Sequence, residues 1–223
     1  RLTKALAGGM KDGEVYVIGA NQGAGKTSLA MQFVIHAIRR RLGVLYFSME
    51  MQARDMFQRM ASIEARIDLL EFREKQRSAL CIDLKAMREA LAIATQDLIQ
   101  YPLLVSTRPS VTPEYLVSEC ARIRQQEQIR LVVIDHMQLM GSTGQPRSDY
   151  EKFTAISRMT KQVAVELGLP VILVSQASRS NATDKRSHLE VSDLRGTGAI
   201  EEDAAAVMLL YPDSEDKKQT EQA

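Results

Sequence analysis

The chain alternates short, continuous apolar runs with longer segments in which apolar residues recur every three or four positions. Short continuous runs are typical of strands buried on both faces, and the longer periodicity is typical of amphipathic helices. The runs predict strands at residues 15–18, 44–47, 103–105, 131–134, 171–174 and 207–210. The periodic segments predict helices over residues 26–40, 52–67, 84–99, 113–128 and 150–167. This alternation predicts an α/β fold with a mainly parallel central sheet and helices on both faces.

Turn and cap residues give some of these boundaries a mechanism. Thr112 followed by Pro113 is typical of an N-cap with proline in the first helical turn, and Gly168 before Leu169 and Pro170 is typical of a helix end. The polar stretches 141–149 and 177–191 are expected to be mobile loops. We expect one domain over residues 1–212, C-terminally incomplete, and a flexible polar tail over 213–223.

Composition narrows the class of protein. A chain of 223 residues with 45% hydrophobic content can form one substantial α/β domain. The formal net charge of +1 gives no bulk electrostatic reason to bind nucleic acid, so such a role must rest on a local site. Cys81 and Cys120 lie far apart, which favours reduced thiols in a cytoplasmic protein over a disulfide framework or a zinc site. No apolar run is long enough for a membrane span.

The segment after the first predicted strand has the composition of a phosphate-binding loop. Glycines at 23 and 25 let backbone N–H groups surround phosphate oxygens, Lys26 reaches the terminal phosphates, and the Thr27 hydroxyl can bind Mg²⁺. The predicted nucleotide-binding residues are Ala20, Asn21, Gln22, Gly23, Ala24, Gly25, Lys26, Thr27 and Ser28. Ala20 stands where the general pattern has glycine, and Gly19 comes one residue early. The alternative is a glycine-rich turn before a helix.

Three further strands end in side chains with suitable chemistry, and ligands of open α/β sheets gather at the carboxyl ends of strands. Glu50 follows the second strand, at a tip expected to neighbour the phosphate loop, and can serve as general base toward a water that attacks the γ-phosphorus. The alternative is that Glu50 lies in the first turn of the next helix and complements its dipole.

Asp135 ends the fourth strand, the arrangement that holds magnesium in phosphate-loop enzymes, and we assign no role to the adjacent His136, which is interpreted as a packed or hydrogen-bonded neighbour. Gln176 ends the fifth strand, where its amide can hydrogen-bond the γ-phosphate and act as a sensor. The alternative for Gln176 is a polar residue that closes a strand.

Together these segments resemble the motor domain of DnaB-type replicative helicases. The resemblance rests on five motifs in order: Ala-Asn-Gln-Gly-Ala-Gly-Lys-Thr, Phe-Ser-Met-Glu-Met, Val-Ile-Asp-His-Met-Gln-Leu-Met, Ser-Gln-Ala-Ser-Arg-Ser and Ser-Asp-Leu-Arg-Gly-Thr-Gly-Ala-Ile-Glu-Glu-Asp-Ala. It runs from about residue 2 to residue 211, and an alanine at the start of the phosphate loop is usual in that family.

The resemblance implies a RecA-like P-loop NTPase fold, use of ATP with Mg²⁺, and hexameric rings that move 5′ to 3′ along single-stranded DNA and unwind duplex DNA at the replication fork. It implies catalytic roles for Lys26, for Glu50 as base and for Gln176 as sensor, with Mg²⁺ held by Thr27 and Asp135. It also assigns residues 193–198 to a loop that grips the DNA backbone, through Arg195, Gly196 and Gly198. The alternative for this loop is a helix entry with Asp193 as N-cap. Primase and a helicase loader are expected partners.

Two parts of the family pattern are not found in this sequence. The N-terminal domain does not precede residue 2, and no Lys-x-Arg pair fits an arginine finger among residues 213–223. We therefore expect this chain alone to hydrolyse ATP slowly and to associate weakly. The rival interpretations are a RecA-like or clock-type scaffold whose assembly is controlled by ATP without strand separation, and a regulatory DNA-binding module with a degenerate ATPase site.

Overall fold

A computed structural model describes residues 4, 6, 8–77, 84–142, 144–177, 189–194 and 197–211. Its centre is a six-stranded sheet with the order β3-β2-β4-β5-β1-β6, in which every pair of neighbours runs parallel. The strands are β1 (Val15–Ala20), β2 (Gly43–Ser48), β3 (Leu103–Ser106), β4 (Ile129–Asp135), β5 (Val171–Gln176) and β6 (Ala204–Leu210).

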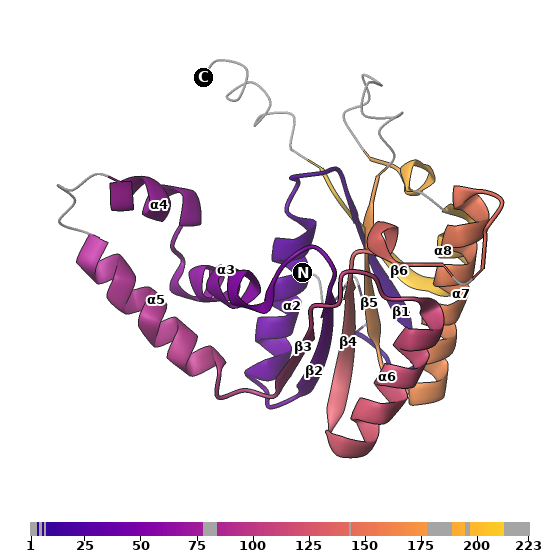
Figure 1. Ribbon diagram of the computed structural model, residues 1–223, viewed down its shortest axis with the longest axis horizontal. Coiled ribbons are helices and arrows are strands. Elements are labelled where there is room, and N and C mark those ends of the chain that lie inside the picture. The colour runs from indigo at the N-terminus through magenta and orange to yellow at the C-terminus, as the bar shows by residue number, and fades with distance from the viewer. Residues whose placement is uncertain are drawn as a thin grey trace, which may run out of the picture.

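Helices cover both faces of this sheet (Figure 1). On one face lie α2 (Lys26–Ile38), α3 (Ala53–Ala65), α4 (Leu69–Arg77) and α5 (Leu84–Leu98). On the other lie α6 (Pro113–Gln126), α7 (Asp149–Leu167) and α8 (Thr197–Asp203). Short 3₁₀ turns occur at η1 (Met137–Leu139) and η3 (Val191–Asp193). In Figure 1, α4 and α5 extend away from the sheet.

The strands are apolar throughout because they are buried on both faces. In β2, Leu45 and Phe47 belong to the hydrophobic core under α6 and α7, whereas Val44 and Tyr46 belong to the core under α2 and α3. Alternate residues of one strand therefore stabilise opposite layers.

The structure confirms the predicted α/β architecture, with each predicted strand and helix present within a few residues of its expected bounds. Thr112 caps α6, because its hydroxyl accepts a hydrogen bond from the Tyr115 N–H and Pro113 occupies the first turn. Gly168 ends α7 in the left-handed conformation at φ 57°, which glycine adopts without a steric penalty.

Two helices were not predicted. Within α4 the sequence is mostly charged and, among residues 69–76, only Phe72 is buried, so the apolar periodicity is too weak to indicate a helix. Helix α8 is short and is held on α7 by the Ser157 hydroxyl, which donates to Asp203 Oδ2 at 2.7 Å.

Cys120 is buried in the core, and burial raises the pKa of its thiol to about 12. Cys81, the expected tail 213–223 and most of the expected loop 177–191 lie outside the described residues.

Candidate active site

The loop between β1 and α2 has the geometry expected of a phosphate cradle. Gly23 and Gly25 have φ values of 80° and 90°, a region that L side chains rarely adopt. Gly25 directly precedes α2, whose first residues Lys26 and Thr27 are buried. The N–H groups of the first helical turn and the positive end of the helix dipole therefore face the loop, which favours an anionic ligand.

The position of Gly19 has a packing reason. A Cβ atom there would lie 2.7 Å from Cδ2 of Leu194 and 2.9 Å from Cδ2 of Leu209. A side chain at this position would therefore require Leu194 and Leu209 to move, and Ala20 is the last residue of β1. Leu194, in the predicted DNA loop, therefore lies beside the strand that leads into the phosphate cradle, and it also forms an antiparallel bridge with Ala177 after β5.

Glu50 lies in a tight turn after β2. The Ser48 hydroxyl donates to the Met51 carbonyl at 2.8 Å, and the Met49 N–H donates to the Asp135 carbonyl at 3.0 Å, so the turn is fixed to the end of β4. Helix α3 begins only at Ala53, which excludes the alternative that Glu50 lies in its first turn. The Glu50 side chain is 58% exposed.

The strand order corrects one expectation about Glu50. We expected the tip of β2 to neighbour the phosphate loop, but β4 and β5 lie between β2 and β1 in the sheet. The turn after β2 instead brings Glu50 toward the phosphate loop. Glu50 accordingly lines the same hollow as Ser28 of α2.

Asp135 is buried at the end of β4 and has one oxygen available for a further partner. Its Oδ2 accepts a hydrogen bond from the Tyr46 hydroxyl at 2.8 Å, whereas Oδ1 is buried and has no hydrogen-bond partner among the described residues. Burial, followed by the charge of Asp135, raises the pKa of Tyr46 well above its ordinary value, so Tyr46 remains a donor. A carboxylate with one oxygen oriented and one unpaired fits a cation ligand.

His136 is a packed neighbour in this site, as expected. Its ring is buried, with Nδ1 at 3.6 Å from Glu50 Oε2 and 3.9 Å from Asp135 Oδ1. Burial is the main cause that lowers the pKa of His136, and the charge of Lys26 lowers it further, while Asp135 and Glu50 act in the opposite direction. Because His136 Nδ1 lies near an oxygen of Glu50 and an oxygen of Asp135, these three residues share one edge of the sheet.

Gln176 completes this edge from β5, where it pairs with Ala20 of β1. Its main chain is held on the other side by Gln138, a residue of the third motif for which no role was predicted. Nothing local in the sequence indicates this contact, because Gln138 stands among apolar residues and its partners lie more than 35 positions away.

The predicted DNA-binding residues are only partly described. Arg195 and Gly196 lie outside the described residues, and Gly198 lies in the first turn of α8, where an added Cβ would be 3.3 Å from the Tyr150 hydroxyl. Asp193 belongs to η3, and its Oδ2 accepts a hydrogen bond from the Glu190 N–H at 2.8 Å. Since α8 begins at Thr197, Asp193 is not the N-cap of that helix, and that alternative is wrong.

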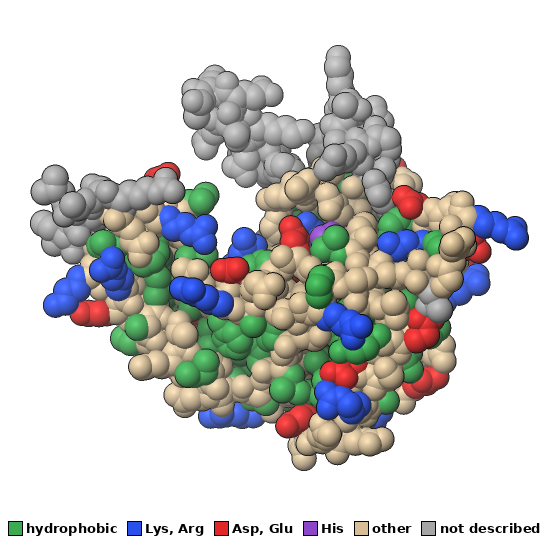
Figure 2. All heavy atoms as spheres, in the orientation of Figure 1, with side chains coloured by type: hydrophobic (Ala, Val, Ile, Leu, Met, Phe, Trp, Pro, Cys, Tyr) green, Lys and Arg blue, Asp and Glu red, His purple; other side chains and the backbone are tan. Residues whose placement is uncertain are grey.

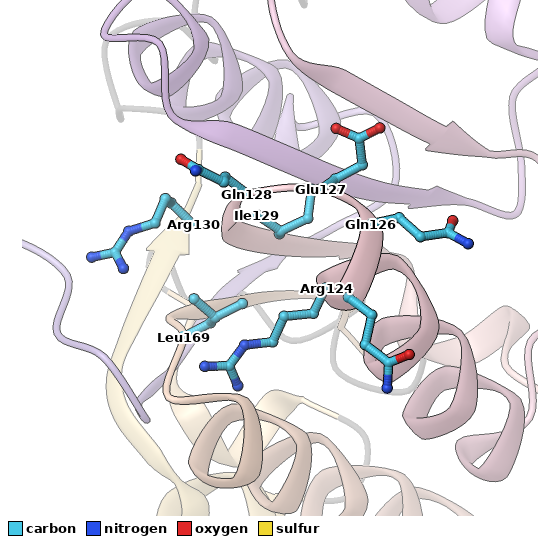
Figure 3. Close-up of a pocket in the computed structure, with 8 residues that line it drawn as sticks. Arg124, Gln126, Glu127, Gln128, Ile129, Arg130 and Leu169 are labelled. Atoms are coloured by element: carbon cyan, nitrogen blue, oxygen red, sulfur yellow. The ribbon is translucent and has the colours of Figure 1, made fainter.

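Two hollows help to delimit the site. One, of about 640 Å³, lies between α3 and α4 beside the Glu50 turn, and its lining includes Arg59 and Arg73. Figure 2 shows acidic and basic side chains interspersed over this part of the surface. The other, of about 350 Å³, is lined by Arg124, Arg130 and Leu169 and lies at the amino ends of β4 and β5 (Figure 3). The second hollow is therefore at the opposite end of the sheet from the phosphate loop.

The fold and this edge define a RecA-like P-loop NTPase domain. The chain belongs to a family described as the DnaB-like helicase C-terminal domain, whose model matches residues 2–223. None of the helices in the described ranges is long and apolar enough to cross a membrane.

Individual similarities agree with this family. The replicative DNA helicase DnaB of Leifsonia xyli subsp. xyli is 30% identical over 219 residues, which cover 98% of this chain and 47% of that protein. The chain thus spans about half the length of the curated relatives that it matches. Among solved structures, one described as an ATPase domain has a TM-score of 0.84 at 24% identity, covering 96% of this chain and 74% of that one. A DnaB-like replicative helicase studied for its interactions with primase has the same TM-score and identity, with coverage of 95% and 50%.

Proposed function

We propose that this domain is the ATP-hydrolysing motor of a replicative DNA helicase. The observation that carries the proposal is the joining of four strand ends: Ala20 pairs with Gln176, and the Met49 N–H of the Glu50 turn binds the Asp135 carbonyl. A base candidate, a metal-ligand candidate and an amide thus lie at the edge of the sheet that carries the phosphate loop. Membership of the DnaB-like helicase C-terminal domain family supports the same function.

In this mechanism ATP binds through the loop 20–28. The main-chain N–H groups before α2 hold the phosphates, and Lys26 neutralises the charge that develops on the γ-phosphoryl group. Glu50 accepts the proton of the attacking water, since its exposed carboxylate lies on a turn that solvent can reach. Gln176 contacts the γ-phosphate and reports its loss to the residues after β5.

Magnesium would be held by the Thr27 hydroxyl and Asp135. The unpaired Oδ1 of Asp135 fits this role, as does the burial of Thr27. Mg²⁺ keeps several waters and binds substrate phosphates together with one or two protein oxygens, so a large cluster of protein ligands is not required. When bound, the ion would supply charge stabilisation for the phosphoryl transfer.

The motor would act on single-stranded DNA, 5′ to 3′, as one subunit of a homohexameric ring in the cytoplasm. Arg195, Gly196 and Gly198 would bind the DNA backbone, in contacts that carry no base information. The contact between Leu194 and Gly19 supports a link between this loop and the phosphate cradle. A DnaB-like replicative helicase has been solved for its interactions with primase, and we extend primase, with a loader, to this protein as a partner.

The proposal is tested by strand displacement from a forked DNA substrate with the whole protein, ATP and Mg²⁺. We expect unwinding that requires a 5′ single-stranded tail, and ATP hydrolysis that rises with single-stranded DNA. Lys26→Ala should abolish both, whereas Lys85→Ala, a lysine 88% exposed on α5, should leave both unchanged. Stimulated hydrolysis without strand separation would favour the ATP-controlled scaffold, and hydrolysis insensitive to DNA would refute the motor function.

A further inference from the structure

Gln138 makes three hydrogen bonds to the end of β5. Its Nε2 donates to the Ser175 hydroxyl at 3.0 Å and to the Gln176 carbonyl at 3.1 Å, and its Oε1 accepts from the Gln176 N–H at 2.9 Å. Both main-chain groups of Gln176 are thus bound by one side-chain amide. Because an amide group has the same donor and acceptor pair as a peptide, this side chain reproduces the pairing of a neighbouring strand.

The position of Gln138 explains why such a substitute is needed. The pairing of β4 with β5 extends only as far as Ile134 and Leu173, because β4 ends at Asp135 and the chain turns into η1. On its other edge β5 remains paired with β1 as far as Ala20 and Gln176. Without Gln138, the last residues of β5 would be held on one edge only.

We propose that Gln138 is a positioning residue that fixes Gln176 for its contact with the γ-phosphate. This inference rests on the sensor role proposed for Gln176. The amide joins the turn that follows Asp135 to the strand that carries Gln176, so the metal-ligand candidate and the sensor share one rigid connection. A displacement of about 1 Å in a positioned group can slow a reaction about 100-fold.

Two substitutions at residue 138 separate positioning from the filling of space. Gln138→Met keeps the approximate volume and removes all three hydrogen bonds. Gln138→Glu keeps an acceptor for the Gln176 N–H but, as a carboxylate, cannot donate to the Gln176 carbonyl. Gln126→Met is the matched control, since Gln126 is an exposed glutamine that accepts a hydrogen bond from Arg122 on α6, far from the edge described here.

The experiment measures kcat and KM for DNA-stimulated ATP hydrolysis by the whole protein, binding of a fluorescent ATP analogue, and the melting temperature. We expect kcat to fall about 10- to 100-fold in Gln138→Met and in Gln138→Glu, with analogue binding within about threefold of the wild type, because the phosphate loop is unchanged. Gln126→Met should retain the wild-type kcat. A wild-type kcat in a folded Gln138→Met protein would overturn the inference.

A double-mutant cycle tests whether Gln138 acts through Gln176. If it does, Gln138→Met combined with Gln176→Ala should be no more than about twofold slower than Gln176→Ala alone. Multiplicative losses would show that Gln138 acts elsewhere and would overturn the inference. A lowered kcat in Gln176→Ala together with a wild-type kcat in Gln138→Met rejects the positioning role alone, whereas a wild-type kcat in Gln176→Ala rejects the proposed sensor.

If Gln138→Met fails to fold, Ser175→Ala provides the test, because it removes one of the three hydrogen bonds and keeps the two to Gln176. The expected loss in kcat is then smaller, about two- to fivefold, with unchanged nucleotide binding. An unchanged kcat in Ser175→Ala together with a wild-type kcat in Gln138→Glu would overturn the inference.

Discussion

Polar residues at the two ends of the central sheet differ in their burial and in their hydrogen bonding. At the carboxyl end, Asp135, His136 and Ser175 are buried, and Asp135 Oδ1 and His136 Nδ1 have no hydrogen-bond partner within the described ranges. At the amino end, the pair between Arg130 and Asp12 lies at the surface: the two groups are 3.6 Å apart, and both side chains are more than half exposed.

This difference bears on what each end of the sheet costs in folding free energy. A buried polar group without a partner costs about 1–3 kcal/mol of folding free energy, whereas an exposed ion pair contributes about 0–1 kcal/mol. The buried polar groups at the carboxyl end therefore lower the folding stability, whereas the exposed ion pair at the amino end does not. Such uncompensated groups concentrate at functional sites, which agrees with the assignment of the active site to the carboxyl end.

The largest expected effect is on turnover at the carboxyl end. Glu50→Gln removes the proton acceptor but keeps the shape of the side chain, so kcat should fall about 10²- to 10⁴-fold while ATP binding persists. Steady-state hydrolysis and analogue binding measure the two quantities. The matched control is Glu127→Gln, at an exposed glutamate beside the amino-end hollow. Wild-type turnover in Glu50→Gln would remove Glu50 from its role.

The second prediction distinguishes the effect of Asp135 on turnover from its effect on the free energy of unfolding. Asp135→Asn removes the buried charge and should lower Mg²⁺-dependent turnover about 100-fold, because the metal contributes several kcal/mol of charge stabilisation. Without metal and nucleotide, its free energy of unfolding should not fall below that of the wild type, since an amide is less costly to bury than a carboxylate. Tyr46→Phe should instead destabilise the protein by about 1–3 kcal/mol, because it leaves Asp135 Oδ2 without its donor.

Urea unfolding in the absence of Mg²⁺ distinguishes these variants. If Asp135→Asn is the less stable of the two, Asp135 stabilises the fold, and the comparison between the two ends of the sheet fails. If Asp135→Asn retains wild-type Mg²⁺-dependent turnover, Asp135 is not a metal ligand.

The sequence predicted those parts of the site that depend on local pattern. The loop 20–28 and the ends of β4 and β5 follow apolar runs, so their chemistry can be read in order along the chain. The strand order cannot be read in this way, because it depends on which apolar faces pack together. For this reason the position of β2, separated from β1 by two strands, was not anticipated.

Residues that act through distant partners were also missed. Tyr46 stands in an apolar run, and its hydroxyl binds Asp135, which lies 89 positions further along. Gln138 is similarly distant from Ser175 and Gln176. Neither residue differs locally from a core or turn residue, so only the folded chain reveals that each is hydrogen-bonded to a residue of the candidate site. The packing of Leu194 and Leu209 beside Gly19 is equally invisible in the sequence, because all three residues lie far apart along the chain.

The third prediction concerns shape at the amino end. Gly43 begins β2, and an added Cβ would lie 2.3 Å from the Gln128 carbonyl oxygen, which is main chain and cannot rotate away. Gly43→Ala should therefore destabilise the protein by about 1–3 kcal/mol while the kcat of the folded fraction stays unchanged. The control is Ser118→Ala, at an exposed position of α6. A glycine such as Gly144 would not serve as a control, because its φ of 75° would strain an alanine at that position. A stable Gly43→Ala protein would show that the amino end tolerates added volume.

The smallest expected effect tests the amino-end charges themselves. Arg130→Ala removes the pair with Asp12, whose atoms are 3.6 Å apart and screened by solvent. The free energy of unfolding should change by no more than about 0.5 kcal/mol, with kcat and nucleotide binding as in the wild type. Urea titration at low and at high salt measures the stability, and the small difference should shrink further at high salt because ions screen the pair. A loss above about 1 kcal/mol would mean that the amino end, like the carboxyl end, depends on specific charges, and that the two ends differ in burial alone.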